Sequence, residues 1–211
     1  KTDCAFLNAE YPGGITGLVK KGYVKITKEQ LIRDPYKTLD RESVLHTLTP
    51  DQERAVKTIN EDERTVQLLH GVTGSGKTKV IMRLIDRTLA DKKTVIMLVP
   101  EISLTPQTVN IFCRRYGERV AVIHSSLSQG ERQDAWRRIA EGGVDLVIGT
   151  RSAIFAPIRN LGLIVIDEEH EHTYKSESDP KYHARDIAAF EVLVGQERLH
   201  VGRGVHAIKT I

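Results

Sequence analysis

One short stretch of the sequence combines glycines, a lysine and a hydroxyl residue at the spacing of a phosphate-binding loop. It reads Gly71-Val72-Thr73-Gly74-Ser75-Gly76-Lys77-Thr78 and fits the pattern G-x-x-x-x-G-K-[ST]. The glycines let the backbone turn tightly around a polyphosphate, so that successive N–H groups and the start of a following helix face the anion. Lys77 is expected to reach the β- and γ-phosphates, and the Thr78 hydroxyl to bind Mg²⁺. The alternative is a glycine-rich turn that matches by chance.

A second segment with chemical potential is acidic and follows an apolar strand directly. Ile164-Val165-Ile166 runs into Asp167-Glu168-Glu169-His170. Beside a phosphate-binding loop, Asp167 is expected to orient Mg²⁺ and Glu168 to position and activate the attacking water. His170 lies further on, where a hydrogen bond to a neighbouring loop would let it report the nucleotide state. The alternative is a solvated acidic turn, but the preceding strand and the phosphate-binding loop favour the functional interpretation.

Apolar runs and capping signals predict the elements that would hold these two segments. Buried strands are expected at Val66–Leu69, Thr94–Val99, Val120–His124, Val144–Ile148 and Leu161–Ile166, and helices at Lys77–Ala90, Pro106–Tyr116 and Gln129–Glu141. Thr49-Pro50-Asp51-Gln52 predicts a further helix start with a capping box, and Ser128 with Glu131 predicts another. The strands are rich in Val, Ile and Leu, as in sheets covered on both faces. The fold class is therefore α/β, with a mainly parallel sheet flanked by helices and its chemistry at the carboxyl ends of strands.

Composition limits the class of protein. The chain has 211 residues, 40% of them hydrophobic, and a formal net charge of +3, which permits a polyanionic partner without establishing one. Cys4 and Cys113 lie far apart, which argues against a zinc site or a disulfide framework here and fits a reducing cytosol. No apolar run approaches the roughly 20 residues of a membrane span, so we expect no membrane partner and a cytoplasmic location. Because the chain starts at Lys1, we expect a fragment.

The organisation changes along the chain. Within residues 1–36, Leu18–Ile26 predicts a helix end followed by a strand, and Asp34-Pro35-Tyr36 is a breaker. Residues 37–47 are polar and are expected to form a linker. The strand–helix alternation occupies 48–190, whereas 191–211 are unassigned.

Together, these segments resemble the superfamily 2 helicases and, within them, the bacterial replication-restart helicases of the primosomal protein N′ family. The resemblance covers roughly residues 18–190. The stretches that carry it are Gly71–Thr78, Leu98–Gln107, His124–Ser128, Gly149–Pro157, Asp167–His170 and Tyr182–Asp186. It implies an ATP-dependent 3′→5′ DNA helicase that assembles the primosome at stalled forks, with this chain supplying the RecA-like, ATP-binding motor lobe. ATP and Mg²⁺ would be the cofactors, forked and single-stranded DNA the substrates, and primosome proteins and single-strand DNA-binding protein the partners.

The resemblance also assigns roles to individual residues. Gln52 corresponds to a glutamine that reads adenine, and a side-chain amide can both donate to and accept from one base edge. The alternative, a helix-start glutamine in a capping box, is compatible with that role. Tyr174 lies in a loop that couples DNA contact to hydrolysis, and Tyr174 and Tyr182 are expected to stack on bases or else to pack within a surface loop. Arg185 and His183 are weaker candidates in the same loop.

Further DNA contacts are implied at strand ends and near the N-terminus. Pro100, Thr150 and Arg151 correspond to loops that touch the single-strand backbone, and the alternative for Arg151 is a structural ion pair. Residues 1–36 resemble the end of a winged-helix domain, in which Lys20 and Lys21 would face duplex DNA. The alternative is a domain that only packs against the helicase core.

Several parts of the family are not recognised in this sequence. They are the domain that captures a nascent 3′ end, the second RecA-like lobe with its arginine finger, and the cysteine-rich region, so zinc is expected in full-length members but not in this fragment. Lobes of this kind hydrolyse ATP in pairs, and such a finger contributes about 10³–10⁵ in rate. We therefore expect weak activity from this fragment. The alternative functions are another superfamily 2 translocase of the restriction type, or a nucleotide-gated DNA-binding fragment without turnover.

Overall fold

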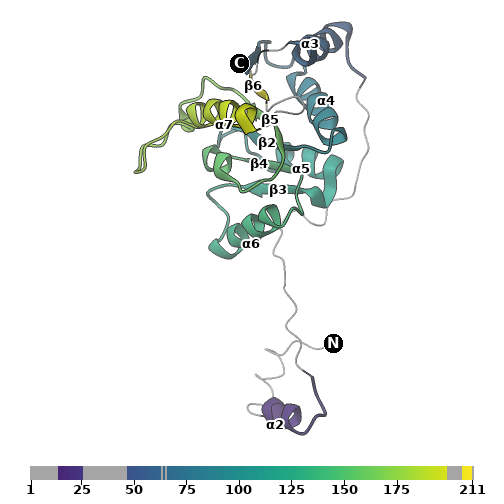
Figure 1. Ribbon diagram of the computed structural model, residues 1–211, viewed down its shortest axis with the longest axis vertical. Coiled ribbons are helices and arrows are strands. Elements are labelled where there is room, and N and C mark those ends of the chain that lie inside the picture. The colour runs from purple at the N-terminus through teal and green to yellow at the C-terminus, as the bar shows by residue number, and fades with distance from the viewer. Residues whose placement is uncertain (1–13, 26–46, 63, 65, 199–205, 211) are drawn as a thin grey trace. The chain divides into compact units, whose positions relative to one another are not determined.

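A parallel six-stranded sheet forms the centre of the larger of two compact units, Lys1–Ile32 and Arg33–Ile211, in the computed structural model (Figure 1). The structure describes residues 14–25, 47–62, 64, 66–198 and 206–210. The strands are β1 (Val66–Leu69), β2 (Thr94–Leu98), β3 (Val120–Ile123), β4 (Leu146–Gly149), β5 (Leu161–Ile166) and β6 (His206–Thr210). They lie in the order β1-β6-β5-β2-β4-β3, and every pair is parallel. The predicted α/β fold class is confirmed.

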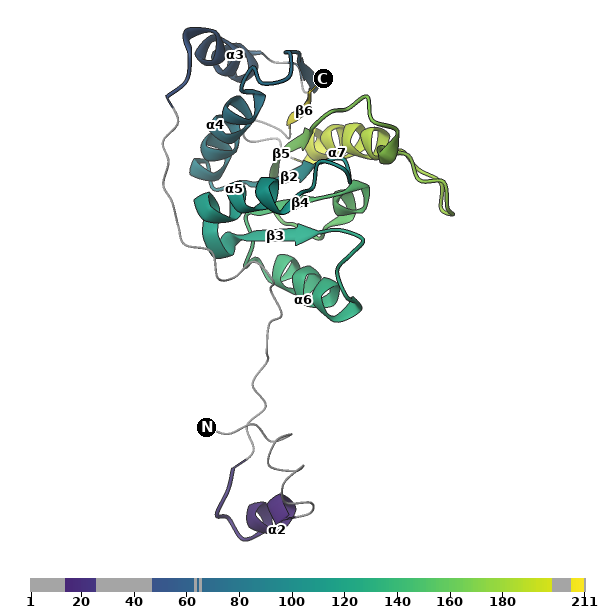
Figure 2. The ribbon, with the colours of Figure 1, turned by 180° about the vertical axis from the view of Figure 1, so that it is seen from behind.

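Helices cover both faces of this sheet (Figures 1 and 2). They are α3 (Pro50–Glu61), α4 (Lys77–Ala90), α5 (Pro106–Tyr116), α6 (Gln129–Ala140) and α7 (Ala184–Arg198), with the 3₁₀ turns η1 (Gly117–Arg119), η2 (Arg151–Phe155) and η3 (His172–Tyr174). Both predicted capping boxes form, since the hydroxyls of Thr49 and Ser128 accept hydrogen bonds from the backbone N–H three residues later.

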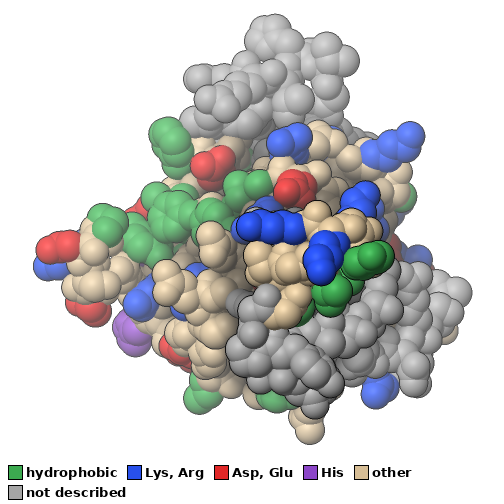
Figure 3. All heavy atoms as spheres, turned by 90° about the horizontal axis from the view of Figure 1, so that it is seen from below, with side chains coloured by type: hydrophobic (Ala, Val, Ile, Leu, Met, Phe, Trp, Pro, Cys, Tyr) green, Lys and Arg blue, Asp and Glu red, His purple; other side chains and the backbone are tan. Residues whose placement is uncertain are grey.

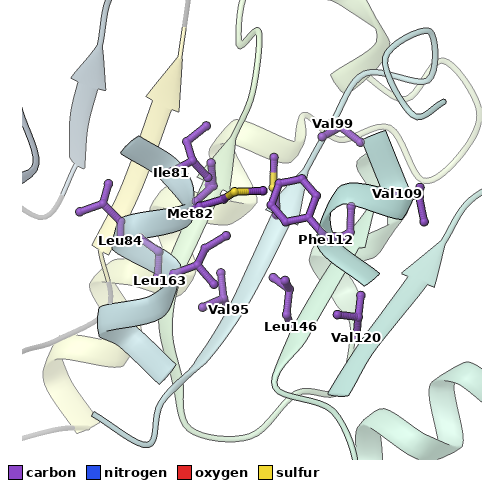
Figure 4. Close-up of a cluster of buried hydrophobic side chains, with 14 of the residues drawn as sticks. Ile81, Met82, Leu84, Val95, Val99, Val109, Phe112, Val120, Leu146 and Leu163 are labelled. Carbon is purple, nitrogen blue, oxygen red and sulfur yellow. The ribbon is translucent and has the colours of Figure 1, made fainter. Parts of the chain in front are cut away.

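Strand alternation divides the core into two layers. Successive strand residues point to opposite faces, so Val95 and Met97 of β2 pack under α4 and α5, whereas Ile96 and Leu98 pack under α6 and α7. The first layer contains Ile81, Met82, Leu84, Phe112 and Leu163 (Figure 4). Helix α3 adds Ala55, Val56 and Ile59 to the edge of that layer. The buried strands β2 to β5 support the loops at the carboxyl end of the sheet.

The segment 191–211, left unassigned above, contributes a central strand. Strand β6 lies between β1 and β5, in parallel register with both. Its sequence, His206-Ala207-Ile208-Lys209-Thr210, has too few apolar residues to predict a buried strand. Strand β6 forms because it pairs with β1 and β5, which lie far from it in the chain. The local sequence pattern of residues 206–210 does not reveal this pairing.

The smaller unit contains α2 (Gly14–Lys20), which buries Ile15. A turn follows in which Gly22 has a φ of 76°, and Lys20 and Lys21 are exposed. The strand predicted after this turn does not include Tyr23–Lys25, and its remainder lies outside the described residues. The expected breaker at Asp34-Pro35-Tyr36 and most of the 37–47 linker also lie outside the described residues. In the part of the chain that is described, no helix has the length and apolar character needed to cross a membrane.

Replacing Phe112 with Ala should destabilise the larger unit by about 3–5 kcal/mol, because a fully buried ring would leave a cavity between α5 and the sheet. Urea unfolding measures this change. Phe190 on α7 is 60% exposed, and Phe190→Ala is the matched control with an expected cost of about 0.5 kcal/mol or less. Equal losses from the two substitutions would contradict the described core.

Candidate active site

The phosphate-binding loop runs from β1 into α4, as predicted. Gly74 and Gly76 have φ values of 80° and 82°, a left-handed conformation that glycine adopts without strain. The Lys77 Nζ donates to the carbonyls of Gly71 at 2.5 Å and Val72 at 3.3 Å, so its ammonium lies inside the curve of the loop. A polyphosphate in the loop would offer this ammonium anionic oxygens in place of neutral carbonyls. The backbone and the lysine therefore fit the predicted nucleotide.

Gln52 at the start of α3 braces the same loop. Its Nε2 donates to the Ser75 carbonyl at 2.9 Å, while its Oε1 accepts from the Thr49 N–H at 3.1 Å. A Cβ on Gly76 would lie 2.5 Å from this Nε2, so a larger residue there would be strained by its φ and would also displace the Gln52 amide from the loop. Gln52 thus serves the capping box and the loop together. Its contact with adenine stays a prediction.

The acidic segment begins where β5 ends. The Asp167 Oδ1 accepts hydrogen bonds from the Thr210 hydroxyl of β6 and from the Glu168 N–H, the latter at 3.1 Å. The same Glu168 N–H approaches the Thr210 hydroxyl oxygen at 2.9 Å, and Glu168 has a φ of 45°. Sequence reasoning missed Thr210, which is fully buried and lies 43 residues from Asp167 in the chain.

A pocket of about 340 Å³ brings the two predicted segments together. Its lining includes Gly71, Thr73 and Lys77 from the loop, and Glu168 and His170 from the acidic segment. Thr78 and Asp167, the predicted Mg²⁺ ligands, are not part of this lining. Both carry oxygen donors of the kind Mg²⁺ prefers, and Asp167 keeps its second carboxylate oxygen clear of the Thr210 bond.

His170 and the other acidic residues have different surroundings. His170 is exposed, with its Nε2 3.9 Å from the Glu171 carboxylate, so its coupling role stays a prediction. The Glu169 carboxylate accepts from Arg185 at 2.9 Å, which makes Arg185 an ion-pair partner. Glu168 alone among these acids combines a place in the pocket lining with a hydroxyl donor, since Ser103 Oγ donates to its Oε2 at 3.1 Å.

Tyr174 is buried beneath the acidic segment. Its ring is 1% exposed, which leaves no face for a nucleobase, so the stacking hypothesis does not fit this residue. The hydroxyl lies 2.5 Å from the Asp167 carbonyl and 3.2 Å from the Leu98 carbonyl. The Leu98 carbonyl already accepts the Asp167 N–H at 2.9 Å, so the single hydroxyl proton is assigned to the Asp167 carbonyl. Burial, followed by the charges of Asp167 and Glu168, raises the Tyr174 pKa, and the hydroxyl remains a donor.

A second pocket, of about 300 Å³, lies among the loops at the ends of β2, β3 and β4 and is called the loop pocket below. Its lining includes Glu101, His124, Ser125, Thr150, Arg151 and Tyr182. Arg151 Nη1 donates to the carbonyls of Lys175 at 3.0 Å and Thr173 at 3.4 Å, so it holds the loop that carries Tyr174 rather than forming the alternative ion pair.

Two other predicted DNA-contacting residues differ in accessibility. Pro100 is buried, and its carbonyl accepts the N–H groups of Ser103 and Leu104, so it is not placed to touch DNA and the prediction for it is not supported. Tyr182 is partly exposed and meets Phe155 edge to face, with ring centroids 4.9 Å apart. Acidic and basic side chains are interspersed on the face shown in Figure 3.

Comparisons with known proteins agree with this geometry. Residues 49–195 match the DEAD/DEAH box helicase family. The chain is 50% identical over 179 residues to the replication restart protein PriA of Bacillus subtilis, covering 82% of this chain and 22% of that protein. It is 42% identical over 198 residues to the replication restart protein PriA of Synechocystis sp., covering 93% of this chain and 24% of that protein. The predicted resemblance is confirmed, and the chain spans less than two thirds of the length of these relatives.

Solved structures support the fold alone. A structure of RecG bound to a three-way DNA junction is similar at a TM-score of 0.57 and 24% identity, over 80% of this chain and 21% of that one. The DUF1998 helicase MrfA bound to DNA is similar at a TM-score of 0.51 and 18% identity, over 77% and 24%.

Tyr174→Phe should destabilise the protein by about 1–3 kcal/mol, because it leaves the Asp167 carbonyl without its buried donor while the ring still fills its space. The free energy of unfolding in urea measures this loss. The matched control is Tyr182→Phe, since among the described residues the Tyr182 hydroxyl has no hydrogen-bond partner. A loss for Tyr182→Phe equal to that for Tyr174→Phe would refute the assignment.

Burial lowers the pKa of His124 below its usual value of 6.5, and the nearby Arg132 acts in the same direction, while Glu131 and Glu101 oppose it. Protonation therefore favours the unfolded chain, and stability is lost as the pH falls from 6.5 through the lower folded pKa. An NMR titration of the imidazole should give a midpoint under 6.5. His124→Gln should reduce the loss of stability between pH 7 and pH 5, and a midpoint above 6.5 would contradict this prediction.

Proposed function

Because the chain belongs to the DEAD/DEAH box helicase family, we propose that it is the ATP-binding lobe of a DNA motor that acts in replication restart. The observation that carries the proposal is the shared pocket, in which Lys77 of the phosphate-binding loop and Glu168 of the acidic segment face one space. A cation for phosphate and a carboxylate for water are the two groups that phosphoanhydride hydrolysis needs from one lobe.

Each predicted residue then has a role. The loop from Gly71 to Gly76 binds the polyphosphate through its N–H groups, and Lys77 holds the terminal phosphates. Thr78 and Asp167 would hold Mg²⁺, which supplies charge neutralisation on the phosphates. Glu168 orients the attacking water and accepts its proton. Gln52, already braced on Ser75, would sense the adenine from the side of the loop.

Substrate and partners are proposed from the relatives. The name replication restart protein, together with the exposed loop pocket, supports single-stranded and forked DNA as the substrate class. Translocation in the 3′→5′ direction, primosome proteins, single-strand DNA-binding protein, zinc in the full-length protein and a cytoplasmic location are further parts of this proposal. Thr150, Arg151 and Tyr182 are the proposed single-strand contacts, and Lys20 and Lys21 the proposed duplex contacts.

Lys77→Ala should weaken binding of a fluorescent ATP analogue in Mg²⁺ by about tenfold or more, because a charged hydrogen bond to phosphate is worth roughly 1.5–3 kcal/mol. Equilibrium titration of fluorescence measures the Kd. The matched control is Lys79→Ala, which removes the same charge from an exposed position two residues along α4. Equal affinities of the Lys77→Ala and unchanged chains would overturn the nucleotide assignment.

Turnover is tested in the same samples. Phosphate release by this chain is expected to be slow with or without forked DNA, since the proposed second lobe supplies the transition-state arginine. Robust unwinding by the 211 residues alone would contradict the division into two lobes. Nucleotide binding with no hydrolysis even after a second lobe is supplied would favour the nucleotide-gated DNA-binding alternative.

A further inference from the structure

One tight turn lines the loop pocket through Glu101 and contacts Glu168, a residue that lines the nucleotide pocket. It follows β2 and is closed by hydrogen bonds from the N–H groups of Ser103 and Leu104 to the Pro100 carbonyl, each at 3.0 Å. The N–H of the preceding Val99 is tied to the Gly149 carbonyl of β4 at 2.9 Å. The two bonds to the Pro100 carbonyl hold the turn in one shape, so that a displacement at one end can be transmitted to the other.

The first end of this turn reaches the loop pocket. The Glu101 carboxylate lines that pocket and accepts a hydrogen bond from the Ser125 hydroxyl, and Ser125 also accepts Arg132 on its carbonyl at 3.4 Å. Glu101 thus adds a negative charge beside the cations Arg132 and Arg151. A phosphate drawn in by those cations would repel this carboxylate and weaken its hold on Ser125.

The second end of the turn contacts Glu168, which lines the nucleotide pocket. Two residues after Glu101, the Ser103 hydroxyl donates to the Glu168 Oε2 at 3.1 Å. Glu168 is the carboxylate that faces Lys77 across the pocket, and its backbone is fixed by Thr210. Since the backbone of Glu168 is fixed, the hydroxyl of Ser103 is the group that sets the direction of its side chain.

We propose that Ser103 is a positioning residue for Glu168, and that the Pro100–Leu104 turn couples phosphate binding in the loop pocket to the orientation of that carboxylate. This inference rests on the proposed function. A nucleic-acid phosphate displaces Glu101, the turn moves as a unit, and Ser103 releases Glu168 toward the water beside the terminal phosphate. Nucleic-acid contact and nucleotide binding are thereby linked, and the linkage must be reciprocal.

The test measures the Kd of a fluorescent ATP analogue in Mg²⁺, with and without a saturating thymidine oligonucleotide. In the unchanged chain the oligonucleotide should shift this Kd by about fivefold or more, a common size for coupled sites. Ser103→Ala should abolish most of the shift, whereas Ser103→Thr keeps the hydroxyl and should retain it. ADP lacks the γ-phosphate that faces Glu168 and should show a smaller shift.

Controls separate positioning from general damage. Thr108→Ala removes a hydroxyl that bonds Thr105 on the adjoining helix, and should leave the shift unchanged. Glu101→Gln should tighten oligonucleotide binding and also remove the shift. Combining Glu101→Gln with Ser103→Ala should reduce the shift in Kd no further than either substitution alone, because both residues act in the same coupling.

The outcomes distinguish this inference from the proposed function. Failure of the unchanged chain to bind the ATP analogue overturns both. Binding of nucleotide and oligonucleotide with no shift, or a full shift retained in Ser103→Ala, overturns the coupling alone. A circular dichroism melt verifies that each variant is folded, and Ser103→Thr tests the same hydroxyl with one methyl group added.

Discussion

The hydrogen bond from the Asp167 N–H to the Leu98 carbonyl is the constraint on which both pockets depend. It pins the end of β5 to the end of β2, and the two loops that leave these strands then diverge. One carries Asp167 and Glu168 toward the phosphate-binding loop, and the other carries Glu101 toward the loop pocket. The buried Tyr174 packs where the ends of β5 and β2 meet. Its burial keeps water away from the carbonyls that its hydroxyl approaches. This one hydrogen bond therefore sets the positions of Asp167, Glu168 and the turn that carries Glu101.

The parallel sheet explains why chemistry gathers at that point. All six strands end at the same edge, and the side chains of β2 to β5 are largely buried on both faces, so along these strands polar side chains have room only where strands stop. Strand β6 adds to this edge the hydroxyl of Thr210, which bonds Asp167 while its backbone carbonyl accepts the Glu169 N–H at 2.7 Å. The fully buried Thr210 costs little because its hydroxyl and its carbonyl both have hydrogen-bond partners.

Local pattern was sufficient for most of the elements between Pro50 and Ile166 and insufficient for the contacts. Helices α4 and α5 and strand β5 have the predicted bounds, because their apolar spacing and caps lie within the segments themselves. Strand β6 could not be predicted, because its stability comes from two neighbours rather than from its own residues. The partners of Arg151 and Tyr174 are 7 to 76 residues away in the chain, and they are backbone carbonyls, which carry no sequence signal. Spacing likewise identified Glu168 but not Ser103, whose hydroxyl reaches it from another loop.

The type of acceptor decides which cations near the acidic segment remain available to an anion. Arg185 is paired with the Glu169 carboxylate, so its charge is largely neutralised within the protein. Arg151 instead donates to the neutral carbonyls of Thr173 and Lys175, which accept its hydrogen bonds without forming an ion pair with it at the loop pocket. A guanidinium has five N–H donors, so it can hold these carbonyls through one nitrogen and still offer others to a phosphate. Arg151 can therefore stabilise the loop that carries Tyr174 and attract an anion from one position, and the structure does not force a choice between the two.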